Sequence, residues 1–210
     1  VLFRSRRRAE LLELLLEIEY GPLPPPPAAV HGEILHPHQI KRMNGLRYSS
    51  YRLLTEGGRH PFWFCLTVMA PPGDGPFPVV VNGDGCWRFV TDAVVEEVTS
   101  RGYMLVTFNR TELAPDAYTS ERSTGLYAVY PDSPFRALAA WAWGYHRVVD
   151  FLQTLKQADP SRIAITGHSR GGKTVMLAGA TDERIALTAP NNSGSNRSEE
   201  HTSELQSPNT

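Results

Sequence analysis

The stretch "RIAITGHSRGGKTVMLAGA", residues 162–180, holds the side chains of this sequence that are best suited to chemistry. Residues 167–171 read GHSRG, a G-x-S-x-G pattern that follows a β-branched run and precedes residues with helical spacing. A serine in such a strand-turn-helix is typical of a nucleophile elbow, which lifts the hydroxyl above the sheet. We therefore predict that Ser169 is a nucleophile. The alternative is an ordinary serine in a glycine-rich turn.

Two cations lie beside this serine. Arg170 follows it directly, and Lys173 lies one helical turn further on, on the same side of the predicted helix. Cations at a helix N-terminus oppose the helix dipole, so a functional reason for them is favoured over simple solvation. They suit an anionic or sugar-acid substrate, or a developing oxyanion. His168 is not the expected base, because the elbow points adjacent side chains apart, and we expect it to pack.

The flanking patterns predict the elements that position this serine. Short apolar runs, typical of strands buried on both faces, alternate with helical patterns, which predicts an α/β fold with a mostly parallel sheet and helices on both faces. An amphipathic helix over 6–20 and a stiff proline-rich linker precede this unit. Strands are expected at 45–58, 61–75, 77–85, 103–110, 162–168 and 184–192, helices at 90–102, 134–157 and 171–180, and a long loop at 111–133.

Functional sites of such sheets lie at the carboxyl ends of the strands. Gly83, Asp84 and Gly85 follow one predicted strand and Glu112 follows another, so we expect both loops to line the site. Backbone N–H groups near Gly83 to Gly85 are candidates for a second oxyanion donor. For Asp84, a turn-forming role is the alternative. Asp182 and Glu183 fall at the opposite, amino end of the strands.

Composition excludes several classes of function. The chain has 210 residues, a net charge of −1 and 41% hydrophobic residues, which fits one globular domain and gives no sign of a nucleic-acid partner. The sequence has no apolar run as long as a membrane span. Cys65 and Cys86 are too few for a disulfide framework, and neither has metal-ligand spacing to histidine. We expect no metal, no cofactor and no membrane partner.

The two ends of the chain look foreign. Residues 1–5 and 197–210 resemble in-frame translations of sequencing adapters, so they are set aside from the fold, together with His201. The remaining sequence divides into an N-terminal helix with its proline-rich linker, 6–40, and the N-terminal part of an α/β domain, 41–196. We expect this domain to be truncated before its last strands.

Three segments resemble the glucuronoyl esterases, α/β-hydrolases that cleave esters of 4-O-methyl-glucuronic acid in plant cell walls. They are "AAWAWGYHRVVDFL", "GHSRGGK" and "DERIALTAPNNSG". The resemblance implies that Ser169 is the nucleophile and that Arg170 supports the oxyanion through side chain and backbone. It also implies that Lys173 contacts sugar hydroxyls and that the substrate is a small or polysaccharide-linked ester.

The sequence departs from the fungal pattern at Asn192, where the fungal members carry a glutamate as the triad acid. The resemblance therefore favours bacterial members, which supply the acid from a later loop, and Asn192 is expected to line the site. The histidine base is also expected downstream, and the parent protein is expected to be secreted or periplasmic. Two alternatives remain: another carbohydrate esterase of this fold, such as an acetylxylan esterase, and a catalytically incomplete binding module.

Overall fold

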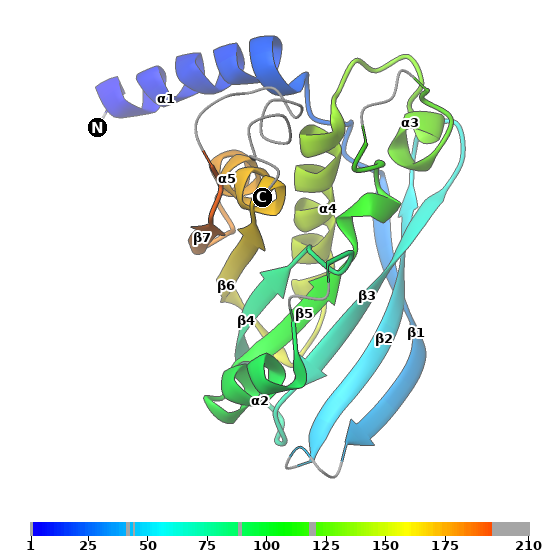
Figure 1. The fold of residues 1–210 in the computed structure, drawn as a ribbon, viewed down its shortest axis with the longest axis vertical. Coiled ribbons are helices and arrows are strands. Elements are labelled where there is room, and N and C mark those ends of the chain that lie inside the picture. The colour runs from blue at the N-terminus through cyan, green and yellow to red at the C-terminus, as the bar shows by residue number, and fades with distance from the viewer. Residues whose placement is uncertain (1, 41–42, 44, 88–89, 118–120, 195–210) are drawn as a thin grey trace, which may run out of the picture.

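The computed structural model describes residues 2–40, 43, 45–87, 90–117 and 121–194, with side chains from residue 6 onward. One seven-stranded sheet runs through the described chain in the order β1-β2-β3-β5-β4-β6-β7 (Figure 1). Its strands are β1 Ala29–Ile40, β2 Leu46–Glu56, β3 Phe62–Ala70, β4 Phe77–Asn82, β5 Met104–Phe108, β6 Ala158–His168 and β7 Leu187–Asn191. The helices are α1 Leu2–Leu15, η1 Leu16–Tyr20, α2 Asp92–Ser100, η3 Arg110–Glu112, α3 Gly125–Val129, α4 Ala137–Leu152 and α5 Arg170–Thr181.

The parallel half of the sheet consists of β5, β4, β6 and β7. The chain leaves β4 through α2 to reach β5 on one side, and leaves β6 through α5 to reach β7 on the other. β4 and β6 are neighbours whose connections run in opposite directions, and a crevice opens at the carboxyl ends of such strands. The topology therefore selects the ends of β4 and β6 as the place for a site.

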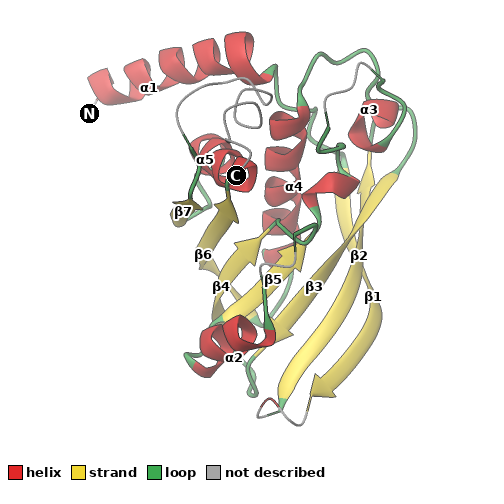
Figure 2. Cartoon of the chain, in the orientation of Figure 1, coloured by secondary structure: helices red, strands yellow, loops and turns green. Residues whose placement is uncertain are grey.

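The antiparallel half of the sheet consists of β1, β2 and β3, and β3 also pairs antiparallel with β5 (Figure 2). The two predicted antiparallel strands are β2 and β3. Residues 29–40, grouped with the linker from the sequence, instead form β1, which pairs with β2 along its length. Their polar, proline-containing sequence gave no strand pattern, but an edge strand tolerates Pro37 because only one of its sides is hydrogen-bonded.

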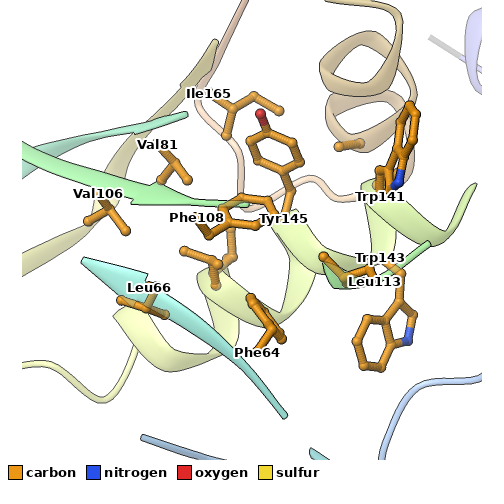
Figure 3. Packing of buried hydrophobic residues seen from close by; sticks show 14 of the residues in the cluster. Phe64, Leu66, Val81, Val106, Phe108, Leu113, Trp141, Trp143, Tyr145 and Ile165 are labelled. Carbon is orange, nitrogen blue, oxygen red and sulfur yellow. The ribbon is translucent and has the colours of Figure 1, made fainter. Parts of the chain in front are cut away.

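The main hydrophobic core lies between the sheet and α4 (Figure 3). Every residue of α4 except Asp150 is buried, which explains why its sequence is mainly apolar around the whole helix. α5 packs beside α4. α2 covers the other face of the sheet through a smaller cluster that includes Val95, Met69 and Leu105. Helices thus lie on both faces, as predicted.

The N-terminal helix ends where the sequence predicts. Gly21 follows η1 with φ 70° and a Cβ there would lie 2.6 Å from the Pro134 carbonyl oxygen, so both conformation and space require glycine. The predicted loop 111–133 contains the short helix α3 and begins inside η3. No described helix is long and apolar enough to cross a membrane.

Candidate active site

Ser169 stands between the last residue of β6 and the first residue of α5. Its backbone has φ 54° and ψ −115°, a strained conformation that L-residues rarely adopt. Its N–H donates to Asn191 O at the end of β7 (2.9 Å), and its carbonyl accepts from Lys173 N (3.1 Å). The hydroxyl caps no N–H of α5, so it is not used for helix capping. This geometry is that of a nucleophile elbow.

The two glycines of the pattern are required for different reasons. A Cβ on Gly167 would lie 2.5 Å from Gly171 O, so the strand and helix arms of the elbow would collide. A Cβ on Gly171 would lie 2.1 Å from Asp84 Oδ1. The first glycine lets the turn close, and the second lets a buried carboxylate approach the elbow.

A cavity of about 260 Å³ opens above the serine, lined by Trp87, Arg110, His168, Ser169 and Arg170. Its volume is close to the lower end of the range of about 300–1,000 Å³ that is usual for ligand sites. A larger hollow of about 720 Å³ lies at the opposite edge of the sheet, near the start of β4 and the end of α2; its two hydroxyl side chains, Thr99 and Ser100, donate to carbonyl oxygens of α2. Chemistry rather than size selects the cavity at Ser169.

The loop after β4 is held in place by hydrogen bonds from its backbone N–H groups. Gly83 N–H donates to Tyr145 Oη (2.7 Å), Asp84 N–H to Asn82 Oδ1 (2.9 Å) and Gly85 N–H to Phe108 O (3.0 Å). All three N–H groups therefore have protein acceptors, and the structure does not support the prediction of a second oxyanion donor among them. Trp87, two residues after Gly85, lines the cavity.

Asp84 is fully buried and touches both the elbow and the end of β5. Its Oδ2 accepts the His168 N–H at 2.6 Å, and its Oδ1 pairs with Arg110. Burial raises the pKa of the Asp84 carboxyl, while the His168 N–H and the Arg110 guanidinium act in the opposite direction. Asp84 is therefore more than a turn former, because it fixes the backbone immediately before Ser169.

The tryptophan-rich helix α4 braces the same region. Tyr145 Oη accepts from Gly83 N–H and donates to Thr166 O (3.1 Å), which connects the ends of β4 and β6. The Trp141 ring lies 4.7 Å from the Arg110 guanidinium carbon, and its Nε1 donates to Ala114 O (2.9 Å). α4 thus contacts the segments after β4 and β5 and the end of β6.

Arg170 and Arg110 are joined by Asp116. Arg170 Nη1 lies 2.5 Å from Asp116 Oδ1, and Arg110 Nη2 donates to Asp116 Oδ2 at 2.9 Å. The Arg170 guanidinium is therefore an ion-pair partner within the site. Its backbone begins α5, where helix N–H groups and the helix dipole favour negative charge.

The remaining predicted site residues lie at the expected edge of the sheet. Lys173 is half-buried, one helical turn from Ser169. Asn192 is exposed at the carboxyl end of β7 with φ 47°; among the described non-glycine residues, only it and Ser169 have positive φ. His168, expected to pack, lines the cavity. Neither Lys173 nor Asn192 is part of the cavity lining, so their contact with a substrate stays a prediction.

Glu112 lies at the predicted edge but faces β3, where its Oε2 accepts the Cys65 N–H at 3.1 Å. Asp182 lies beyond the far end of α5 and pairs with Arg184, on the side predicted for it. Across the described ranges, no three His, Cys, Asp or Glu side chains gather as metal ligands would. Residues 197–210, including His201, lie outside the described residues.

Three members of the site were missed from the sequence: Trp87, Arg110 and Asp116. Arg110 follows β5 within two residues of its end, and the rule that sites lie at carboxyl ends of strands applies to it as well as to Glu112. Trp87 follows the Gly83–Gly85 loop and is 55% exposed, although tryptophan usually buries its ring. Asp116 gave no signal, because only the fold brings it to Arg170.

Comparison with known proteins agrees with this geometry. The family model for fungal glucuronyl esterase matches residues 55–203, most of the α/β unit and the whole elbow. The chain belongs to the glucuronoyl esterase family. The 4-O-methyl-glucuronoyl methylesterase of Podospora anserina is 36% identical over 194 residues, covering 90% of this chain and 36% of that protein. The chain therefore spans less than half the length of this relative.

Solved glucuronoyl esterases also share the fold. The family 15 carbohydrate esterase from Teredinibacter turnerae superposes with a TM-score of 0.77 at 25% identity, covering 91% of this chain and 52% of that one. A mutant of the Sporotrichum thermophile enzyme in complex with methyl 4-O-methyl-β-D-glucopyranuronate gives 0.68 at 29% identity, covering 90% and 47%. The α/β-hydrolase fold predicted from the sequence is confirmed.

Proposed function

We propose that the protein to which this chain belongs is a serine carboxylester hydrolase that acts on glucuronoyl esters through an acyl-enzyme. The observation that carries the proposal is Ser169 with φ 54°, between β6 and α5 and beside Arg170, in a chain of the glucuronoyl esterase family. The related structure with bound methyl 4-O-methyl-β-D-glucopyranuronate supports the choice of a uronate ester.

In the proposed reaction, Ser169 Oγ attacks the ester carbonyl carbon and its proton passes to a general base. The carbonyl π electrons move to oxygen, and the oxyanion that forms lies next to the Arg170 guanidinium and the start of α5. When the tetrahedral intermediate collapses, the alcohol leaves and takes up a proton, and water later releases the acid by the same steps in reverse order. No cofactor takes part in these steps.

The base and its acid are proposed to come from chain beyond β7. Among the described histidines, His168 is adjacent to Ser169 in the chain, and His146 is buried under α5 with Nε2 against Ala178 O (3.2 Å). In this fold the acid and the histidine follow the nucleophile in chain order. The substrate is proposed to be a plant cell-wall polymer, so we expect the protein to be exported.

The test uses the full-length protein and a methyl ester of glucuronic acid, with acetylated xylan as the competing substrate. We expect hydrolysis of the glucuronate ester, and we expect Ser169→Ala to lose several orders of magnitude in kcat. A loss of less than about tenfold would refute the assignment of the nucleophile. Preferential release of acetate from xylan would instead assign the protein to acetyl ester hydrolysis.

A further inference from the structure

Four charged side chains form an unbroken chain from the backbone of the elbow to the surface of the cavity. The His168 N–H donates to Asp84 (2.6 Å), Asp84 pairs with Arg110, Arg110 pairs with Asp116 (2.9 Å), and Asp116 pairs with Arg170 (2.5 Å). Two carboxylates alternate with two guanidinium groups. The chain is therefore neutral overall, and each charge has a partner of opposite sign.

Exposure rises in one direction along this chain. The side chains of Asp84, Arg110, Asp116 and Arg170 are 0%, 1%, 10% and 19% exposed, respectively. The buried end contacts the backbone of the elbow, and both arginines, Arg110 and Arg170, line the cavity. The Trp141 ring, 4.7 Å from the Arg110 guanidinium carbon, completes the buried surroundings of Arg110.

The two guanidinium groups have different tasks in this arrangement. Arg110 is buried under the cavity and its Nη1 and Nη2 each bind one carboxylate, so its rigid fork sets the separation of Asp84 and Asp116. Arg170 follows the nucleophile and has a long side chain with many rotamers. A fixed carboxylate restricts those rotamers before substrate arrives, which is how a preorganised site lowers the cost of stabilising a new charge.

We propose that Asp116 is a positioning residue that holds the Arg170 guanidinium at the oxyanion, and that Arg110 and Asp84 align Asp116 with the elbow. The role of Asp116 rests on the proposed function for the identity of the reaction. It does not rest on the proposed function for the reactivity of Ser169. Because Asp116 acts through Arg170, its removal lowers the rate of attack by Ser169 and leaves substrate affinity nearly unchanged.

The test is a double-mutant cycle in the full-length protein, read out by the rate at which a fluorophosphonate labels Ser169. Labelling forms an O–P bond and breaks the P–F bond, which releases fluoride, while the serine proton passes to the base. The phosphonyl oxygen of the probe takes the place of the oxyanion. We expect Asp116→Ala to slow labelling about 10- to 100-fold, less than the about 10²–10³-fold usual for loss of a direct oxyanion donor. In an Arg170→Ala background, Asp116→Ala should change the rate less than about twofold.

Asp150 provides a matched control, because it also bridges two arginines, Arg147 (2.6 Å) and Arg184 (2.7 Å), at the far end of α4. We expect Asp150→Asn to leave the labelling rate unchanged. Asp116→Glu, which keeps the charge, should recover part of the rate. If urea titration shows that Asp116→Ala is poorly folded, Asp116→Asn, which keeps the shape of the side chain, replaces it in the double-mutant cycle.

Independent, multiplicative losses in the Asp116 and Arg170 variants would overturn the proposal, as would a normal labelling rate in a folded Asp116 variant. A parallel measurement of kcat and KM on the glucuronate methyl ester should show the loss in kcat. If Ser169 is labelled but the glucuronate ester is not hydrolysed, the proposed substrate is wrong, and the cycle still decides the role of Asp116.

Discussion

Replacement of Gly171 by alanine tests whether the buried carboxylate of Asp84 is required at the elbow. The new Cβ would lie 2.1 Å from Asp84 Oδ1 and 2.8 Å from its Cγ. An ordinary contact is about 3.5 Å, so the carboxylate has to retreat by about 1.4 Å. That movement breaks the 2.6 Å hydrogen bond from the His168 N–H and displaces the pair with Arg110.

Each hydrogen bond to a charged group contributes about 1.5–3 kcal/mol, and alanine recovers up to about 1 kcal/mol in a helix. We therefore expect Gly171→Ala to lower the free energy of unfolding of the full-length protein by about 2–5 kcal/mol. Urea titration measures this change as a lower midpoint with an unchanged slope. The same variant should lose kcat on the glucuronate methyl ester, because the backbone before Ser169 shifts.

The control is the same substitution in an Asp84→Ala background. The clash is then absent, and Gly171→Ala should cost less than about 1 kcal/mol. Wild-type stability and activity for the single Gly171→Ala variant would refute the reasoning. Equal costs in both backgrounds would show that the glycine is needed for the turn itself and not for Asp84.

Three further predictions concern Lys173, His146 and the isolated chain. Lys173→Ala should raise KM for uronate esters about 10- to 100-fold, which is the value of a hydrogen bond to a charged group. The KM for simple aryl acetates should stay nearly unchanged, and equal losses on both substrates would show a role in the fold. Burial lowers the pKa of His146 below its usual 6.5. Below pH 6.5 the unfolded state therefore binds more protons than the folded state, so the stability that is present above pH 6.5 is lost as the pH falls towards the folded-state pKa. Urea titrations from pH 7.5 to 5 should therefore show a fall, at most about 1.4 kcal/mol per pH unit, that is missing in His146→Gln; an identical fall in the variant would contradict this. A polypeptide of residues 1–210 should show no ester turnover. It should also aggregate, since β7 is an edge strand with Leu187 60% exposed. Turnover that disappears on removal of residues 197–210 would show that this tail takes part in catalysis.

The elbow and the alternation of strands and helices were predictable because they are local. A G-x-S-x-G pattern between a β-branched run and a helical pattern specifies a strained turn whose features depend on residues within a few positions of Ser169. Strands buried on both faces likewise leave short β-branched runs, and a buried helix leaves a long, mainly apolar segment. These patterns sufficed to place Ser169, Arg170, Lys173 and Asn192 at one edge of the sheet.

The support of the site was not predictable, because it depends on contacts between residues far apart in the chain. Asp84 and His168 are 84 positions apart, and no local sequence pattern around either residue predicts their hydrogen bond. The same holds for β1, whose polar sequence becomes a strand only because β2 offers a free edge. Local steric rules determined where Ser169 lies in its strand-turn-helix. The burial of Asp84 and Arg110, which requires each charge to have a partner of opposite sign, was decided only by the tertiary structure.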